Sequence, residues 1–146
     1  MPDQQMQAEE AQPKPRSRKH KTKKSIATRN SILEATLQCF IEIGYFRTTT
    51  TEIAKRADVT RGAVQYYFPT TDEVLKASVE YLLDQWLATY YEELRNMPET
   101  SNKFEHGIDT YWKFVRHPLF VAWRELVSAS RTEPSLEAII QPAAVR

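Results

Sequence analysis

The chain has 146 residues, 41% of them hydrophobic, which suits one domain or a small domain followed by part of a second. The only cysteine is Cys39, so an intramolecular disulfide and any metal site built from several cysteines are excluded. The net charge of +1 hides an asymmetry, because residues 1–71 hold 12 Lys and Arg against 7 Asp and Glu, whereas residues 72–146 hold 8 against 12. A basic N-terminal half suits a part that approaches phosphates.

Apolar residues recur at helical spacing, and eight prolines with only three glycines favour helices that are interrupted at their ends. We therefore predict an all-α fold. No apolar run is close to the about 18 residues that a membrane helix needs, so no membrane partner is expected. We expect no enzyme, cofactor or metal, because the sequence lacks a Gly-rich phosphate loop and a nucleophile beside a base, and His106 and His117 stand apart from any ligand cluster.

Residues 1–25 are poor in apolar side chains and rich in Gln, Pro, Lys and Arg, a composition that predicts disorder. A dense basic run lies within them: Lys14, Arg16, Arg18, Lys19, Lys21, Lys23 and Lys24. We interpret this segment as an arm that follows a phosphate backbone or enters a minor groove. The alternative is a tail that only aids solubility.

The first helix is predicted from about Ile26 to Ile43, with an apolar stripe at Leu33, Leu37, Phe40 and Ile41. Gly44 follows as a left-handed stop. This stripe is expected to brace the two helices that come next.

Two short helices joined by a tight turn are predicted between Thr49 and Phe68. Thr49 and Glu52 have the spacing of a capping box at the start of the first helix. The turn is Asp58-Val59-Thr60, and Thr60 is the expected N-cap of a second helix from Arg61 to about Tyr67. This arrangement presents a helix to a DNA groove.

The motif Gly44-Tyr45-x-x-Thr48-Thr49, then Ile53-Ala54-x-x-Ala57-x-Val59-Thr60-x-Gly62-x-Val64, then Phe68, resembles the DNA-binding head of the tetracycline-repressor (TetR) family of bacterial transcription regulators. The resemblance covers about residues 26–86. The family usually has Gly at Asp58, Tyr at Gln65 and Lys at Thr71, and its Tyr and Lys usually touch phosphates.

The first turns of the second helix are the part that can reach base edges, where Arg pairs with guanine and Gln with adenine. Within this helix, the small residue Gly62 lets the helix backbone come close to whatever the helix docks against. Thr48, Thr49 and Lys55 are assigned to phosphates. In full, the predicted DNA-binding residues are Thr48, Thr49, Lys55, Thr60, Arg61, Gly62, Gln65, Tyr66 and Tyr67. The alternatives are a solvated charge for Arg61 and core aromatics for Tyr66 and Tyr67.

A long helix is predicted after Pro69, with an apolar stripe that begins at Leu75 and is widened by Leu87, Tyr91 and Leu94, so that it is buried on more than one side. Met97-Pro98-Glu99 ends it. The resemblance implies that this helix carries ligand-induced movement to the head. Three further helices are expected over residues 101–116, from Pro118, and over residues 135–140.

Six aromatic residues of these later helices could line a pocket for a small hydrophobic effector, with ordinary core as the alternative. They are Trp86, Tyr90, Tyr111, Trp112, Phe120 and Trp123. We divide the chain into a disordered basic arm (1–25), a helix-turn-helix head (26–86, with the motif at 49–68) and a partial α-helical ligand-binding and dimerisation body (87–146).

The resemblance implies a cytoplasmic, sequence-specific transcriptional regulator, a ligand-responsive repressor whose partner is a double-stranded DNA operator. Family members form homodimers through two further helices. Because the chain ends before them, we expect a C-terminally truncated member, or one that dimerises through residues 119–140. The alternative is a helical interaction module or a remnant without regulated DNA binding.

Overall fold

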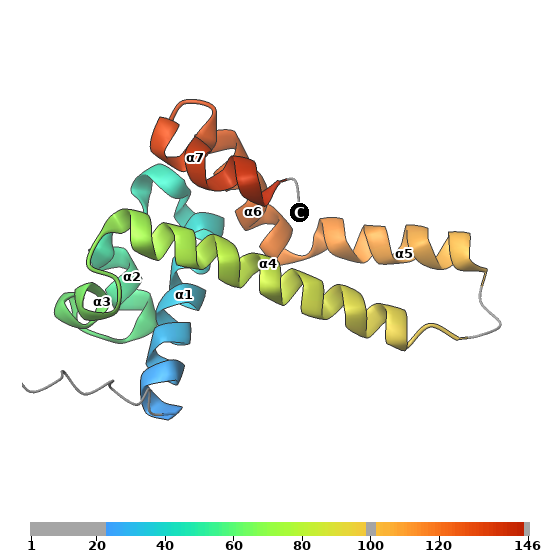
Figure 1. Ribbon diagram of the computed structural model, residues 1–146, viewed down its shortest axis with the longest axis horizontal. Coiled ribbons are helices and arrows are strands. Elements are labelled where there is room, and N and C mark those ends of the chain that lie inside the picture. Colours follow the sequence, from blue (N-terminus) through green and yellow to red (C-terminus); the bar gives the residue numbers. More distant parts are fainter. Residues whose placement is uncertain (1–22, 99–101, 145–146) are drawn as a thin grey trace, which may run out of the picture.

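The computed structural model describes residues 23–98 and 102–144, which form seven α-helices, one short 3-10 helix and no strand (Figure 1). In chain order they are α1 (Lys23–Ile43), η1 (Tyr45–Arg47), α2 (Thr50–Ala57), α3 (Arg61–Tyr67), α4 (Thr71–Arg95), α5 (Lys103–Arg116), α6 (Pro118–Ser130) and α7 (Pro134–Ala143). The all-α prediction is confirmed. None of these helices has both the length and the apolar character needed to cross a bilayer.

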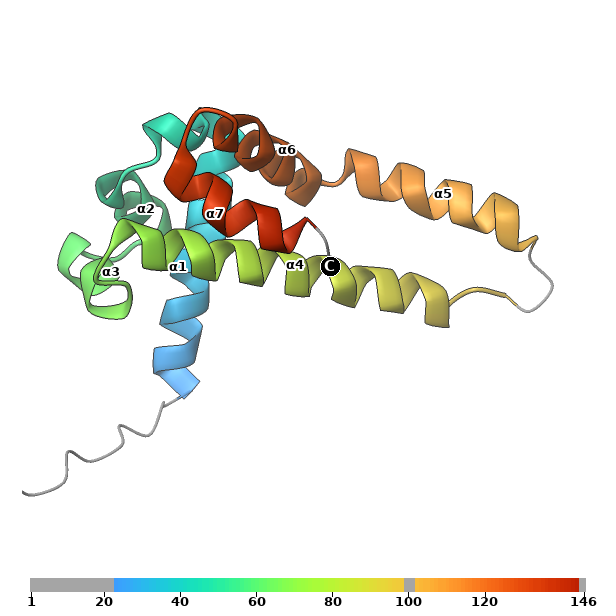
Figure 2. The ribbon, with the colours of Figure 1, turned by 45° about the horizontal axis from the view of Figure 1, so that its top comes forward.

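The long helix α4 organises the molecule (Figures 1 and 2). Its N-terminal half packs beside α1, α2 and α3, and α6 and α7 cover α1 and the same half of α4 from another side. Its C-terminal half extends away from this group, with α5 running alongside. The α2–α3 pair and the α4–α5 pair therefore lie at opposite ends of one continuous helix.

Two clusters of buried side chains hold the helices together. The first joins α1, α2, α3 and α4, and the second joins α1, α4, α6 and α7. The first contains Ile32, Leu33, Ala35, Cys39, Ile53, Ala54, Val64, Phe68 and Val74. The second contains Leu37, Phe40, Leu75, Val79, Leu82, Ala122, Leu126, Ala129, Leu136 and Ile140. Helix α1 contributes to both clusters, but of its predicted stripe only Leu33 packs with α2 and α3, whereas Leu37 and Phe40 belong to the second cluster and Ile41 packs against it. The other α1 residues of the first cluster, Ile32, Ala35 and Cys39, lie outside the predicted stripe.

The ends of the helices follow local signals, with three differences from expectation. α1 begins at Lys23, earlier than the predicted Ile26. Gly44 has a positive φ of 81°, as predicted, but its ψ of 163° is extended rather than left-handed helical. At the start of α4, Thr70 and Glu73 form a full capping box that the sequence analysis did not identify.

The C-terminal half of α4 is more exposed than predicted. Leu87, Tyr91 and Leu94 are 52%, 58% and 41% exposed. Expecting burial on more than one side was wrong for this half, because among the described helices only α5 runs alongside it. Helical periodicity shows which residues share a face, but not whether another element covers it.

The 3-10 helix that precedes α2 is anchored to α6. The backbone N–H of Tyr45 donates a hydrogen bond of 2.7 Å to Oε1 of Glu125. Thr48 closes the same turn by donating its hydroxyl to the Gly44 carbonyl at 2.9 Å. The start of the helix-turn-helix is thus held by a side chain from the C-terminal part of the chain.

A second long-range contact leads to a prediction about pH. The Tyr81 hydroxyl on α4 donates a hydrogen bond of 2.7 Å to Oε1 of Glu34 on α1. Burial first, and then the Glu34 carboxylate, raise the pKa of Tyr81 from 10.0 to about 12. Because folding favours the neutral phenol, the stabilisation is complete below pH 10.0 and is lost as the pH rises towards about 12.

We expect an ultraviolet titration of the folded protein to show a late tyrosine ionisation that Tyr81→Phe removes. Glu34→Gln should move that step to lower pH without abolishing it, because burial remains. A titration curve whose late step is the same in Tyr81→Phe would contradict the assignment.

Candidate nucleic-acid interface

The two short helices and their turn have the geometry that the sequence predicts. Asp58 ends α2 in the left-handed region, at φ 53° and ψ 46°. Thr60 caps α3, because its Oγ1 accepts a hydrogen bond of 3.0 Å from the Ala63 N–H. At the start of α2, Thr49 Oγ1 accepts from the Glu52 N–H at 3.2 Å, so half of the predicted capping box is present.

The other half of that box is replaced by an ion pair. The Glu52 carboxylate binds Arg56 Nη1 at 2.6 Å, and Arg56 Nη2 binds Glu42 of α1 at 3.0 Å. These contacts hold α2 against α1, and both carboxylates pair with the positive charge of Arg56. Lys55, which precedes Arg56 on α2, is exposed.

Helix α3 is buried along one side and exposed along the other. Val64 faces the first cluster and is 2% exposed. On the outer side, Arg61 and Gln65 are one turn apart and both exposed, and Tyr66 is 63% exposed. The helix is therefore an outward-facing rod with one basic and one amide side chain pointing from the same face.

Gly62 lies on this exposed side. A Cβ atom built there would come no closer than 3.8 Å to another atom, which is ordinary van der Waals contact. Packing within the described chain therefore does not require glycine at position 62.

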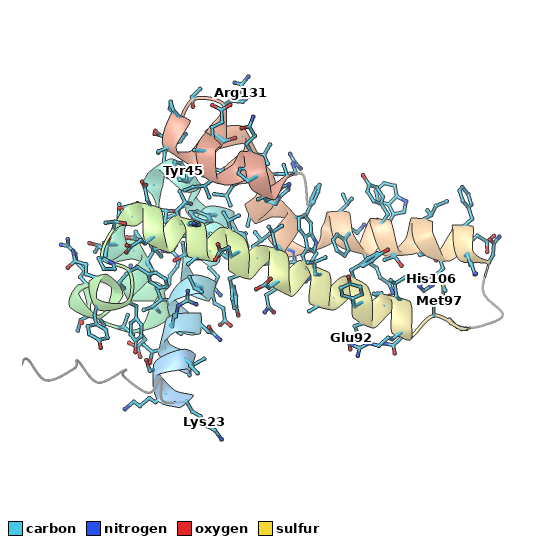
Figure 3. The ribbon with its side chains drawn as sticks, in the orientation of Figure 1. Lys23, Tyr45, Glu92, Met97, His106 and Arg131 are labelled. Carbon is cyan, nitrogen blue, oxygen red and sulfur yellow. The ribbon has the colours of Figure 1, made fainter. Side chains whose placement is uncertain are left out.

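The C-terminal end of α3 is held against the start of α1. The Tyr67 hydroxyl donates to Ser25 Oγ at 3.3 Å, and the Arg29 guanidinium lies 5.2 Å from the centroid of the Phe68 ring. Lys23, labelled in Figure 3, and Lys24 begin α1 and are exposed. Ser25 and Arg29 were not predicted as supports of α3, because both contacts join distant parts of the chain.

The nine predicted DNA-binding residues occupy one region around α2, the turn and α3. Partly buried are Thr48, bonded to the Gly44 carbonyl, and Tyr67, bonded to Ser25. The others are exposed: Thr49, Lys55, Thr60, Arg61, Gly62, Gln65 and Tyr66. The basic run from Lys14 to Lys21 lies outside the described residues.

The six aromatic residues predicted to line a pocket do not form one site. Trp86 stacks on Phe114, with centroids 5.0 Å apart and planes at 10°, and also contacts Phe120 and Trp123 at 6.0 and 6.3 Å. Trp112 is 55% exposed. Phe114 was missed, although it lies one turn after Thr110 and three residues after Tyr111 on the same helix.

The remaining two, Tyr90 and Tyr111, line an open groove of about 530 Å³ between α4 and α5, which we call the α4–α5 groove. Its wall is completed by Leu94, Met97, Lys103, His106, Gly107, Thr110 and Phe114. Across residues 23–98 and 102–144, no group of three or more His, Cys, Asp or Glu side chains is placed to hold a metal ion.

Comparison with known proteins matches the head of this chain. Residues 32–78 match the family described as "Bacterial regulatory proteins, tetR family". The HTH-type transcriptional regulator BetI of Burkholderia lata is 27% identical over 117 residues, which are 76% of this chain and 59% of BetI. The chain thus spans about three fifths of the length of this relative.

Solved structures with a similar fold include a transcriptional regulator from Streptomyces coelicolor A3(2), at a TM-score of 0.65 and 24% identity, which covers 80% of this chain and 68% of that one. GusR of Salmonella enterica gives a TM-score of 0.63 at 20% identity, covering 85% and 64%. At these identities the likeness concerns the fold.

Proposed function

We propose that this chain, whose residues 32–78 match the tetR family of bacterial regulatory proteins, is a sequence-specific DNA-binding transcriptional regulator whose helix α3 enters the major groove. The family is one of regulators rather than enzymes. A protein that binds a bacterial operator acts in the cytoplasm.

The observation that carries this proposal is the exposed face of α3. Arg61 and Gln65 extend from consecutive turns of a capped helix that is fixed to α1. In a major groove, Arg can pair with guanine O6 and N7, and Gln with adenine N6 and N7. Gly62 supports the same role, since its missing side chain lets a phosphate backbone approach where nothing in the described chain needs the space.

Phosphate contacts would come from the edges of this face. Exposed Thr49 and Lys55 would make such contacts, and the basic arm would add positive charge. Tyr67 is better suited to holding α3 in position than to a base contact, because its hydroxyl already bonds Ser25.

We further propose that the regulator is a repressor that acts as a homodimer and responds to a small hydrophobic effector. One α3 contacts one half-site, so a palindromic operator needs two copies about 34 Å apart. Helix α4 runs without interruption from the head to the α4–α5 groove, so it is the element through which an effector there could shift the head.

The test is DNA binding by the purified chain, measured by fluorescence anisotropy with fragments from the DNA upstream of its own gene. We expect saturable binding to one fragment, with affinity that falls steeply as salt rises because Lys and Arg displace counterions. A scrambled fragment of the same length and composition is the control. Equal binding to both, or none at low salt, would favour the interaction module over the regulator.

A further inference from the structure

The α4–α5 groove has a polar column on one wall and an apolar wall opposite. Lys103, His106 and Thr110 follow one another at helical spacing along the side of α5 that lines the groove. Tyr90 and Leu94 lie one turn apart on α4, and Met97 follows just beyond the last residue of that helix, Arg95. Figure 3 shows His106 pointing from α5 towards the end of α4, where Met97 lies.

Two side chains of the polar column have buried atoms without a partner. Among the described residues, three buried side-chain polar atoms make no hydrogen bond: Trp86 Nε1, His106 Nε2 and Thr110 Oγ1. Two of them belong to groove-lining residues one turn apart, and Thr110 is only 7% exposed. A buried polar atom costs free energy unless it is paired, so these two atoms are available to hydrogen-bond a ligand in the groove.

The same wall contains a glycine that the chain itself does not need. Gly107 lies within α5, where glycine is less favourable than alanine, and a Cβ atom there would meet nothing within 4 Å. The lack of a side chain at Gly107 widens the groove on the wall that also holds the unpaired hydroxyl of Thr110. At about 530 Å³ the groove falls in the usual range of small-molecule sites, about 300–1,000 Å³.

The charge of the side chains that line the groove indicates whether the ligand is an anion or a cation. Lys103 is the one charged side chain among the described residues that line it, and it stands on the first turn of α5, where the helix dipole also favours an anion. The rings of Tyr90, Tyr111 and Phe114 would pack against an aromatic body.

We propose that the α4–α5 groove binds a small aromatic carboxylate, with its carboxylate towards Lys103, His106 and Thr110 and its ring between Tyr90 and Phe114. The Thr110 hydroxyl and an N–H at His106 Nε2 would each donate a hydrogen bond, and Lys103 would neutralise the charge. The proposal rests on the proposed function only for the ligand's role as effector. Binding itself is testable without DNA.

The test uses calorimetric titration of the full chain with two probes that share one body, 1-naphthaleneacetate and the neutral 1-naphthaleneacetamide. We expect saturable binding of the acetate and binding of the amide at least about tenfold weaker. Thr110→Val should weaken binding of the acetate about tenfold, since a hydrogen bond to a charged group is lost. Lys103→Gln should weaken it and remove most of the preference for the acetate.

Controls separate binding from folding. Thr110→Val should leave the melting temperature unchanged or raise it, because it removes an unpaired hydroxyl, whereas a purely structural threonine would lower it. Thr89→Val and Lys76→Gln make the same changes on α4 outside the groove and should bind like the parent. Equal affinity for both probes, unchanged affinity in Thr110→Val and Lys103→Gln, or no saturable binding would overturn the proposal.

Failure of this inference and failure of the proposed function give different results. If operator binding is found and the acetate does not bind, the groove assignment is wrong and the regulator stands. If the acetate binds as expected and no DNA fragment is selected, the ligand site stands and the regulator is wrong.

Discussion

Replacing Arg61 and Gln65 together by alanine is expected to remove most of the discrimination between the operator and a scrambled fragment. Each bidentate contact to a base is worth about 1–3 kcal/mol of discrimination, so the pair accounts for about 2–6 kcal/mol if both side chains read bases. Both are exposed and neither is required for packing, so the fold should survive. The measurement is the ratio of the two dissociation constants at fixed salt.

The matched control is Arg131→Ala with Gln141→Ala, which changes the same two residue types at exposed positions on α6–α7. Arg131 is labelled in Figure 3, far from α3. This variant should keep the parental ratio. If the Arg61 and Gln65 variant loses affinity equally for both fragments, these side chains contact phosphates and base reading must come from elsewhere.

The largest expected loss of stability follows from Leu126→Ala. Leu126 on α6 is 0% exposed in the cluster that joins α6 to α1 and α4. Truncating such a leucine removes buried apolar contact and leaves a cavity, which costs about 2–5 kcal/mol in the free energy of unfolding. Urea unfolding followed by circular dichroism measures the change.

The neighbouring residue gives the control. Val127 is 40% exposed, and Val127→Ala should change the free energy of unfolding far less. Similar losses in the two variants would mean that α6 is not packed against α1 as described. Because the Glu125 contact to Tyr45 lies one residue away, Leu126→Ala should also lower operator affinity.

The sequence predicts the helix-turn-helix closely because its signals are local. Thr60 caps the helix that starts one residue later, and Asp58 takes the left-handed geometry that a turn of this length needs. The capping box of Thr70 and Glu73 has the same sequence spacing as Thr49 and Glu52, so it could have been predicted in the same way. The capping box predicted at Thr49 and Glu52 is only half formed, because Arg56, one turn away, binds the Glu52 carboxylate instead.

The parts that the sequence could not predict depend on pairing between distant segments. The early start of α1 accompanies the hydrogen bond that the Tyr67 hydroxyl donates to Ser25 Oγ, and nothing near Ser25 in the sequence indicates this bond. Periodicity likewise places Trp86 on an apolar face, but it does not show that Phe114 will stack on it. The α4–α5 groove also depends on how two distant helices lie beside each other. Of the six aromatic residues predicted to line a pocket, only Tyr90 and Tyr111 therefore line this groove.

The junction of Gly44 and Glu125 limits how the protein can change over evolution. Gly44 has a positive φ, and a Cβ atom there would lie 2.9 Å from the same carboxylate oxygen that Tyr45 binds. An alanine at position 44 would meet both backbone strain and the anchoring carboxylate. A substitution at position 44 should therefore be selected against whatever residue stands at position 125. Loss of Glu125 would in turn remove the acceptor that holds the Tyr45 N–H at the start of the helix-turn-helix.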